Sequence, residues 1–426
     1  MIHEINDPIP MQEGTGFVYP RYDKNCIANI PGTILDFFGV NHDLSKLPME
    51  LTTKVEGANK VVLFVLDGFG YNQFIRYHKE QKFLSSLAEK SDVFHLTSIF
   101  PSQTTNALTS LNTGLTPQEH GLFEYYIYIK EVDRIVNTLR FEPLGSRVRN
   151  ELLDRGFSPE ILFNGHTIQS RLKEEGIKSF THIYASYAYS HYSKLLFKDS
   201  AFIPSLKSSD LIVTLKKKLE QEKGPAYFFV HLSNLDTISH EYGPNSYEYE
   251  AELSAISYLM NKELIQKIDP QTAKETLLML TSDHGGVNIT PQDTTYLNGF
   301  CNILDNLQNG KSGNRILPTG SARDVFLHIK PDKLVETQES LQKRVGHKAK
   351  IVETKDAINN GLFGRGKPRK KFVDRAGNLL ILPYDKETVW FDHFPEINYN
   401  PIGQHGGLSS EEMIVPLAVT RLDSIK

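Results

Sequence analysis

Residues 277–286, Leu-Leu-Met-Leu-Thr-Ser-Asp-His-Gly-Gly, join a short apolar run to a polar turn. An apolar run of this length predicts a buried strand of a parallel sheet. The two glycines end the strand, so Asp283 and His284 are expected where the chain leaves the sheet, the usual place for ligands in open α/β folds. A carboxylate beside an imidazole suits a divalent ion of the zinc type, although an Asp-His pair at a turn is more often a cap or a hydrogen-bonded pair.

Apolar runs alternate with amphipathic segments along the rest of the chain. Strands are expected at residues 61–66, 94–99, 178–183, 227–232, 277–280 and 324–329. Helices are expected at 33–40, 71–90, 104–111, 206–222 and 247–268. This alternation predicts an α/β fold with a doubly wound, mostly parallel central sheet flanked by helices.

The length of 426 residues predicts one large α/β domain with insertions, or two domains. Residues 1–55, which prolines interrupt, are expected to form an N-terminal extension. The looser segments at about 121–200 and 300–400 are expected to be insertions that face the substrate. Cys26 and Cys301 are too few for a disulfide framework, and we expect two buried free thiols.

Charge and hydropathy exclude several classes of function. The net charge of −4 argues against stable nucleic-acid binding, which usually needs a basic surface. The first 16 residues lack the apolar segment of a signal peptide, and no window approaches the roughly 20 apolar residues of a membrane span. The sequence therefore predicts a cytoplasmic protein.

Three other stretches place carboxylates and imidazoles at strand ends or turns. Asp67 directly follows the strand expected at 61–66. Asp236 and His240 are four residues apart, so in a helix they share one face and can reach a single ion. His405 is followed by two glycines, as a ligand on a tight turn would be. Each also has a plain alternative, as a turn residue or an exposed pair.

Residues 101–106, Pro-Ser-Gln-Thr-Thr-Asn, place hydroxyl groups at the expected start of a helix. Backbone N–H groups and the helix dipole at such a position suit an anionic reaction centre. Beside a bound zinc ion, the hydroxyl of a threonine can ionise near neutral pH and attack phosphorus. The alternative for any single threonine here is a plain helix cap.

The ordered set of Asp67, Thr104, Asp236 with His240, Asp283 with His284, and His405 resembles the alkaline phosphatase superfamily. More closely, it resembles the type I phosphodiesterase/nucleotide pyrophosphatase family. Residues 100–121, FPSQTTNALTSLNTGLTPQEHG, are similar throughout to the segment that carries the nucleophile in that family.

This resemblance implies two zinc ions and an alkaline phosphatase-like catalytic domain over residues 56–426. Asp236, His240 and His405 would hold one ion; Asp67, Asp283, His284 and the Thr104 hydroxyl would hold the other. Thr104 would be the nucleophile and would form a phospho-threonine intermediate. The implied substrate is a small phosphate ester or a nucleotide.

The chain departs from the family pattern beside the nucleophile. Many members have lysine where this chain has Gln103, and many have asparagine near the position of Glu124 and Tyr125. Candidate substrate contacts are Tyr125, Phe123 and Asn106. The tyrosines at 184, 187, 189 and 192 form either core packing or a stacking surface, and packing is the commoner case.

Three alternatives remain open at this point. A phosphomonoesterase or a phosphonate hydrolase of the same superfamily would use the same metal ligands. A catalytically silent, metal-containing binding module would keep the fold but not the reaction. A sulfatase is disfavoured because residues 104–108, Thr-Thr-Asn-Ala-Leu, lack its Cys/Ser-x-Pro-x-Arg pattern.

Overall fold

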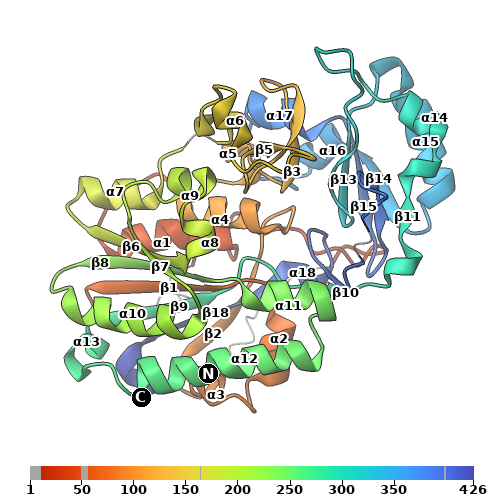
Figure 1. The fold of residues 1–426 in the computed structure, drawn as a ribbon. Helices are drawn as coiled ribbons and strands as arrows, with labels where there is room; N and C mark the ends of the chain where they lie inside the picture. Colours follow the sequence, from red (N-terminus) through yellow and green to blue (C-terminus); the bar gives the residue numbers. More distant parts are fainter. Residues whose placement is uncertain (1–10, 49–55, 164, 398–399) are drawn as a thin grey trace.

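The computed structural model describes residues 11–48, 56–163, 165–397 and 400–426. Its centre is a seven-stranded sheet in the order β2-β18-β9-β1-β8-β6-β7 (Figure 1). The strands of this sheet are β1 (Lys60–Leu66), β2 (Asp92–Thr97), β6 (Lys178–Tyr184), β7 (Ala201–Ser205), β8 (Ala226–Leu232), β9 (Thr276–Thr281) and β18 (Ile414–Arg421). Strands β9, β1, β8, β6 and β7 pair in parallel, and β18 pairs antiparallel with β9 and with β2, so the predicted mostly parallel sheet is confirmed.

Strand β1 is apolar from Val61 to Leu66 because both faces of the sheet are covered. Val61, Leu63 and Val65 belong to the core on one face, and Val62, Phe64 and Leu66 belong to the core on the other. Alternation of side chains along a strand therefore produces a continuous apolar run when neither face meets water.

Helices cover the two faces, as in a doubly wound sheet (Figure 1). One face is covered by α1 (Ile30–Phe37), α4 (Thr104–Thr113), α7 (Ile168–Glu174) and α9 (His191–Leu196). The other is covered by α2 (Tyr71–Tyr77), α3 (Lys82–Lys90), α10 (Ser208–Gln221) and α12 (Tyr247–Leu259). Segments 71–90 and 247–268 thus differ from the predicted single helices: the first is divided in two, and the second continues after α12 as a π-helical stretch, Met260–Ile265.

Strand β18 connects the edge strand β2 to the parallel strands of the central sheet. It runs antiparallel to β9 on one side and to β2 on the other, with Leu417 opposite both Thr281 and Phe94. In the strand order, β18 lies between β9 and β2. The edge strand β2 therefore belongs to the central sheet through its pairing with β18.

The parallel strands bring the predicted site residues to one edge. Leu66 lies opposite Leu232, and Val65 lies opposite Thr281, so β1, β8 and β9 end at the same level. The residues that follow these ends include Asp67, Asp236 and Asp283, which are therefore neighbours in space.

Two smaller sheets lie beside the central one (Figure 1). A three-stranded sheet contains β3 (Tyr126–Ile129), β4 (Arg134–Asn137) and β5 (Glu142–Pro143). A four-stranded antiparallel sheet contains β12 (Thr319–Ser321), β13 (Asp324–Leu327), β15 (Leu379–Pro383) and β14 (Ala349–Glu353). The strand expected at 324–329 therefore exists, but it belongs to this second sheet.

The remaining elements are short or lie around these sheets. They are α5 (Pro117–His120), α6 (Glu151–Asp154), α8 (Ala185–Ala188), α11 (Asn234–Tyr242), α13 (Pro270–Lys274), α14 (Cys301–Asp305), α15 (Leu334–Val345), α16 (Thr354–Asn359), α17 (Lys370–Ala376), α18 (Ser410–Met413), β10 (Val287–Asn288), β11 (Thr295–Tyr296), β16 (Val389–Trp390) and β17 (Gly403–Gln404). Among the described helices, none combines the length and the apolar character needed to cross a membrane.

The four-stranded sheet is tied to the central one by a buried ion pair. Arg323, beside β13, donates to Glu412 of α18 through Nε at 3.0 Å and Nη2 at 2.8 Å, and both side chains are fully buried. Glu412 also accepts from the backbone N–H of Gly407, at 2.9 Å. The same carboxylate thus fixes the small sheet and the loop that carries His405.

The two thiols differ in their surroundings. Cys26 is buried, as expected, but Cys301 is exposed, so that part of the prediction is wrong. Cys301 begins the short helix α14 at the surface of the four-stranded sheet, where an amphipathic turn covers the core with other side chains.

Candidate active site

The candidate site lies at the edge where β1, β8 and β9 end. Asp67 follows β1, Asp283 and His284 follow β9, and Asp236 and His240 lie on α11, which follows β8. Gly68 adopts φ +73°, and a Cβ there would lie 3.0 Å from the Cα of Asp236. A glycine after Asp67 therefore lets the β1 turn approach α11 closely.

One group of potential metal ligands contains Asp236, His240 and His405. The helical spacing of α11 places Asp236 and His240 on one face, with Oδ2 and Nε2 3.4 Å apart. His405 comes from the loop after β17, and its Nε2 lies 3.2 Å from Nε2 of His240 and 3.6 Å from Oδ1 of Asp236. The predicted trio is therefore brought together.

A second set surrounds Asp67. Asp67 forms one potential ligand group with Asp236 and His284 and another with His231 and Asp283. Nε2 of His284 lies 3.5 Å from Oδ1 of Asp67 and 3.4 Å from Oδ2 of Asp283. All six predicted carboxylate and imidazole residues thus meet at one place.

Backbone carbonyls fix the orientation of the three predicted imidazoles. The Nδ1–H groups of His240, His284 and His405 donate to the carbonyls of Gly403, Gly285 and Ser102, at 2.9, 2.8 and 2.9 Å. A carbonyl only accepts, so Nδ1 carries a proton in each ring, and Nε2 is the ring nitrogen left to face a metal ion. This outer hydrogen bond is the arrangement that prepares a histidine to bind a metal.

The electrostatic environment of the site favours the binding of cations. Asp67 Oδ1 and Asp283 Oδ2 are buried and have no hydrogen-bond donor among the described residues. Burial, and then the charges of Asp283 and Asp236, raise the pKa of Asp67 well above its usual range. Burial also lowers the pKa of His405, to about 3, which leaves its imidazole neutral. Neutral imidazoles and carboxylates facing one another in this way fit divalent ions of the zinc type.

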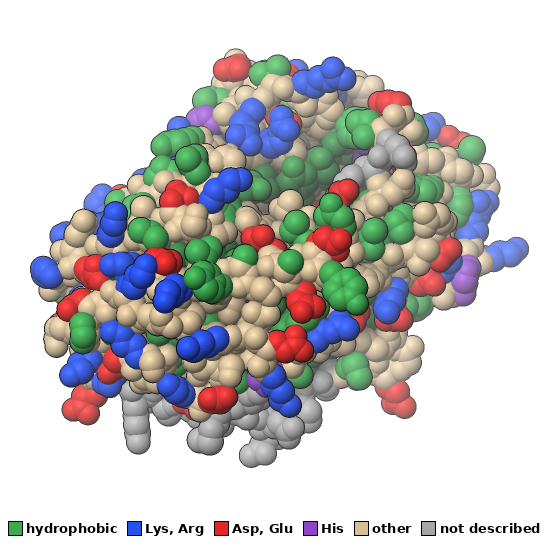
Figure 2. Space-filling view, turned by 60° about the horizontal axis from the view of Figure 1, so that its bottom comes forward, with side chains coloured by type: hydrophobic (Ala, Val, Ile, Leu, Met, Phe, Trp, Pro, Cys, Tyr) green, Lys and Arg blue, Asp and Glu red, His purple; other side chains and the backbone are tan. Residues whose placement is uncertain are grey.

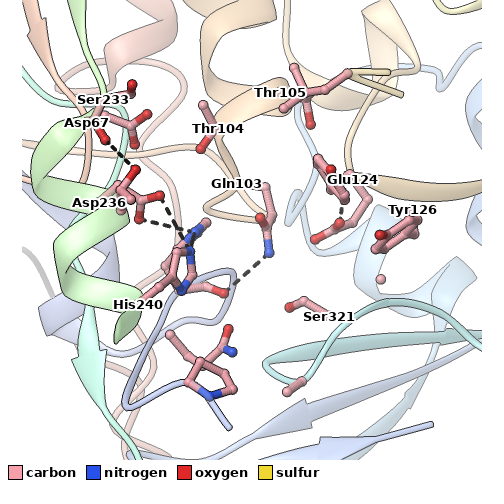
Figure 3. Close-up of a pocket in the computed structure, with 18 of the residues that line it drawn as sticks. Asp67, Gln103, Thr104, Thr105, Glu124, Tyr126, Ser233, Asp236, His240 and Ser321 are labelled. Carbon is pink, nitrogen blue, oxygen red and sulfur yellow. Dashed lines mark hydrogen bonds and ion pairs between the residues drawn. The ribbon is translucent and has the colours of Figure 1, made fainter. Parts of the chain in front are cut away.

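Thr104 is the first residue of α4 and lies beside these groups. It is the one partly exposed residue in 101–110, and its neighbours in that range are buried. Its hydroxyl lies 3.2 Å from Nε2 of His284. Figure 3 shows Asp67, Asp236 and His240 on one side of Thr104 and Gln103, Glu124 and Ser321 on the other.

The three candidate substrate contacts have different positions. Tyr125 lines the cavity at the site, and its hydroxyl accepts from Nδ2 of Asn137 at 2.8 Å. Phe123 is fully buried and packs against Phe326 and Phe372, with ring centroids 4.9 and 5.1 Å apart. Its assignment as a substrate contact is therefore corrected, because core packing takes up its side chain.

Asn106 does not line the cavity either. It is fully buried, and its Nδ2 donates to the carbonyl of Pro101 at 2.7 Å. This bond holds the turn that precedes α4, so the expected contact between Asn106 and substrate is corrected as well. The residue supports the position of Thr104 through the backbone.

His231 belongs to the site but was not predicted from the sequence. It lies in β8, is buried, and its Nε2 is 3.0 Å from Oδ2 of Asp67. Burial lowers the pKa of His231, so its neutral ring donates to the carboxylate rather than adding charge. The only sequence signal was a single imidazole in the apolar run Ala226–Leu232, which is also typical of a core histidine.

A cavity of about 590 Å³ opens above Thr104. Apolar and aromatic side chains form much of its wall, including Leu108, Tyr126, Phe197, Trp390 and Phe394. Of the tyrosine cluster, the residues at 187 and 192 line it. On the face shown in Figure 2, basic and acidic side chains are interspersed, and hydrophobic side chains gather in a hollow. The cavity can hold a substrate with a polar centre and an apolar or aromatic arm.

Comparisons with known proteins support the resemblance found in the sequence. A model of the type I phosphodiesterase / nucleotide pyrophosphatase family matches residues 61–408. A protein of Schizosaccharomyces pombe, described as an uncharacterised pyrophosphatase/phosphodiesterase, is 21% identical over 362 residues, which cover 81% of this chain and 67% of that protein.

Solved structures share the fold. Murine ectonucleotide pyrophosphatase/phosphodiesterase 5 has a TM-score of 0.61 at 16% identity, covering 84% of this chain and 87% of that one. The human protein of the same name has a TM-score of 0.59 at 16% identity, with the same coverage of 84% and 87%. An inactive variant of the murine protein is solved in complex with AMP, and it has a TM-score of 0.61 at 15% identity, with coverage of 85% and 87%.

Proposed function

Because the chain belongs to the type I phosphodiesterase/nucleotide pyrophosphatase family and is a phosphoric ester hydrolase, we propose that it cleaves phosphodiesters with Thr104 as the nucleophile and two zinc ions as cofactors. The observation that carries this proposal is the position of the Thr104 hydroxyl, 3.2 Å from Nε2 of His284 and at the start of α4. This hydroxyl is the one nucleophile candidate among the predicted site residues that borders both the ligand groups and the cavity.

The proposed holders of the ions follow the prediction from the sequence. Asp236, His240 and His405 would hold one ion, and Asp67, Asp283, His284 and the Thr104 oxygen would hold the other. Bound zinc supplies Lewis acidity, which lowers the pKa of a coordinated hydroxyl and neutralises charge on phosphoryl oxygens. The unpartnered buried oxygens of Asp67 and Asp283, and the close approach of Nε2 of His240 to Nε2 of His405, support this assignment.

The reaction would proceed in two displacements at phosphorus. Thr104 Oγ1 loses its proton and forms a bond to phosphorus, while the bond from phosphorus to the leaving alcohol breaks and that alcohol takes up a proton. Water then attacks phosphorus of the phospho-threonine, which releases a phosphomonoester and restores the hydroxyl. The backbone N–H groups at the start of α4 face the developing negative charge and stabilise it.

The residues around Thr104 contribute orientation. Asn106 and Ser102 fix the turn before α4 through Pro101 and the His405 loop, since Ser102 Oγ donates to the carbonyl of Gly407 at 3.0 Å. His231 holds Asp67 in place through the bond to Oδ2. Reacting groups kept within narrow limits in this way lower the entropic part of the barrier.

The substrate class we propose is a small phosphodiester, including nucleotides. The aromatic wall of the cavity, with Tyr126 and Trp390, suits a flat or apolar leaving group. The AMP complex of a protein with this fold is consistent with such a substrate. A phosphomonoesterase of the same superfamily is the alternative that the assay below distinguishes.

The test compares hydrolysis of bis-p-nitrophenyl phosphate and p-nitrophenyl phosphate by the zinc-loaded and chelated protein. We expect diester turnover to be faster, to disappear on chelation and to return with zinc. Thr104→Ala should lower kcat by at least about 10³-fold and keep its zinc, as loss of a nucleophile does. Thr113→Ala, a buried threonine at the other end of α4, is the matched control and should retain turnover.

Three outcomes would contradict the proposal. Near-normal activity of Thr104→Ala would remove that residue from its role. Faster cleavage of the monoester would favour the phosphomonoesterase. Zinc binding without turnover of either ester would favour the silent binding module.

A further inference from the structure

A polar wall of the cavity lies next to Thr104, on the side opposite the metal-binding groups. Its members that line the cavity are Gln103, Glu124 and Ser321, and Asp324 lies behind them. Figure 3 shows the three cavity-lining residues grouped away from Asp67, Asp236 and His240. The mechanism above assigns no role to any of the four side chains.

Hydrogen bonds fix which way round the Gln103 amide lies. Nε2 of Gln103 donates to the carbonyl of His405 at 3.3 Å, and the Glu124 carboxyl group also accepts from Gln103. Gly406, at φ +119°, makes room for this amide, because a Cβ there would lie 2.5 Å from Nε2. Reversing the amide would place its oxygen against two acceptors, so this orientation is strongly preferred.

Glu124 is itself held from several directions. Its Oε2 accepts from the backbone N–H of Tyr125, and the carboxyl group also accepts from the backbone of Tyr126. Glu124 and Asp324 are both fully buried and lie within hydrogen-bonding reach of each other. Glu124 Oε1 and Asp324 Oδ2 have no hydrogen-bond partner among the described residues. A single proton held between the two carboxyl groups would satisfy both.

Burial explains why this proton is retained. It raises the pKa of Glu124 to about 8 and the pKa of Asp324 well above its usual range. Ser321 directs its hydroxyl hydrogen to Oδ1 of Asp324. The donors of Gln103, Ser321 and the carboxyl pair therefore have partners within the protein.

The polar wall presents a hydrogen-bond acceptor to the cavity. Within the described residues, no group donates to Oε1 of Gln103, and this side chain lines the cavity immediately before the proposed nucleophile. An amide oxygen repels a phosphoryl oxygen and binds an N–H or O–H group. A substrate that fits this wall therefore carries a hydrogen-bond donor close to its phosphorus.

On the basis of the proposed function, we infer that Gln103 is a specificity-determining residue that selects phosphodiesters with a hydroxyl or primary ammonium group on a short alkyl arm. Oε1 of Gln103 accepts a hydrogen bond from this group. Glu124, supported by Asp324, is the positioning residue that keeps the amide in its orientation. The arm occupies the side of the cavity opposite the metal-binding groups, beside Ser321.

The test uses four p-nitrophenyl phosphodiesters that share one leaving group. Their second arms are 2-aminoethyl, 2-hydroxyethyl, propyl and 2-(trimethylammonio)ethyl. The first three have nearly equal size, and the fourth has charge but no N–H donor. We expect the zinc-loaded enzyme to favour the aminoethyl and hydroxyethyl esters over the propyl ester about tenfold in kcat/KM, the worth of one good hydrogen bond.

Substitutions locate this preference. Gln103→Leu should reduce the ratio of donor ester to propyl ester to about one, and Gln103→Met serves as a second variant if the first does not fold. Glu124→Gln should lower the same ratio, since a second amide weakens the anchoring of Gln103. A purely structural role for Glu124 would change the rates of all four esters together and leave the ratio unaltered. Zinc content and thermal midpoint show that each variant is folded.

Several results would overturn the inference. Equal turnover of donor and propyl esters by the unmodified enzyme would do so, as would a ratio that survives in Gln103→Leu. Preference for the trimethylammonio ester alone would show that charge, and not hydrogen bonding, is selected. Absence of turnover for all four esters by folded, zinc-loaded enzyme would instead refute the proposed function.

Discussion

Asp67 offers a test of whether the buried carboxylates exist to hold cations. The residue is 3% exposed, and only one of its two oxygens has a hydrogen-bond donor among the described residues. Two more carboxylates, Asp283 and Asp236, act on it and raise its pKa after the effect of burial. Without metal, the buried Asp67 carboxyl group lowers the stability of the fold. With metal, it contributes to metal binding. Asp67→Asn should therefore stabilise the chelated protein and destabilise the zinc-loaded protein.

The magnitude follows from the surroundings and the chain length. Removing an unsatisfied buried group is worth about 1–3 kcal/mol. For 426 residues, the unfolding entropy is about 0.9 kcal/mol per kelvin, so chelated Asp67→Asn should melt about 1–3 °C above the unmodified protein. Each ion at about 100 times its dissociation constant adds about 2.7 kcal/mol. Zinc should thus raise the melting temperature by about 6 °C in the unmodified protein and by about 3 °C in Asp67→Asn.

Scanning calorimetry of both proteins, chelated and zinc-loaded at one pH, measures these shifts. Asp332→Asn, an exposed carboxylate outside the site, is the matched control and should leave both melting temperatures unchanged. The reasoning is refuted if Asp67→Asn lowers the melting temperature equally with and without zinc. In that case, the carboxylate would be an ordinary structural acceptor.

Two further substitutions test features around the site. His231→Asn removes the donor to Oδ2 of Asp67 and should weaken zinc binding about 10- to 100-fold, measured by competition with a chromophoric chelator; unchanged affinity would exclude His231 from ligand orientation. Glu412→Gln leaves the fully buried Arg323 without its counter-charge and should lower the free energy of unfolding by about 3–5 kcal/mol in urea titration; a loss below about 1 kcal/mol would mean that the backbone carbonyls of Asp385 and Glu387 are sufficient partners for Arg323.

The sequence was sufficient where local pattern decides structure. Apolar runs predicted the central strands because a strand covered on both faces has no polar face to show. Asp67, Asp283 and His284 were found because each directly follows such a run, and parallel strands end at one edge. Asp236 and His240 were found because helical spacing alone places them together.

The failures arise where distant packing decides orientation. Phe123 and Tyr125 are two residues apart, yet Phe326 and Phe372, more than 200 positions away, draw only Phe123 into the core. In the sequence, His231 is a single imidazole in an apolar strand. Its role is seen only from its contact with Asp67, the residue that follows β1. Glu124 and Asp324 are 200 positions apart in the sequence, so no local spacing could indicate that they share a proton.

The place of β18 has a consequence for biosynthesis. This strand is made after every proposed metal ligand, yet it holds β2 and β9 in one sheet. Until it inserts, the edge that carries Asp283 and His284 lacks its flanking strand, and pairings between such distant segments form slowly. A nascent chain would therefore stay inert until β18 has been made and has paired with both β2 and β9, although all of the proposed metal ligands precede it.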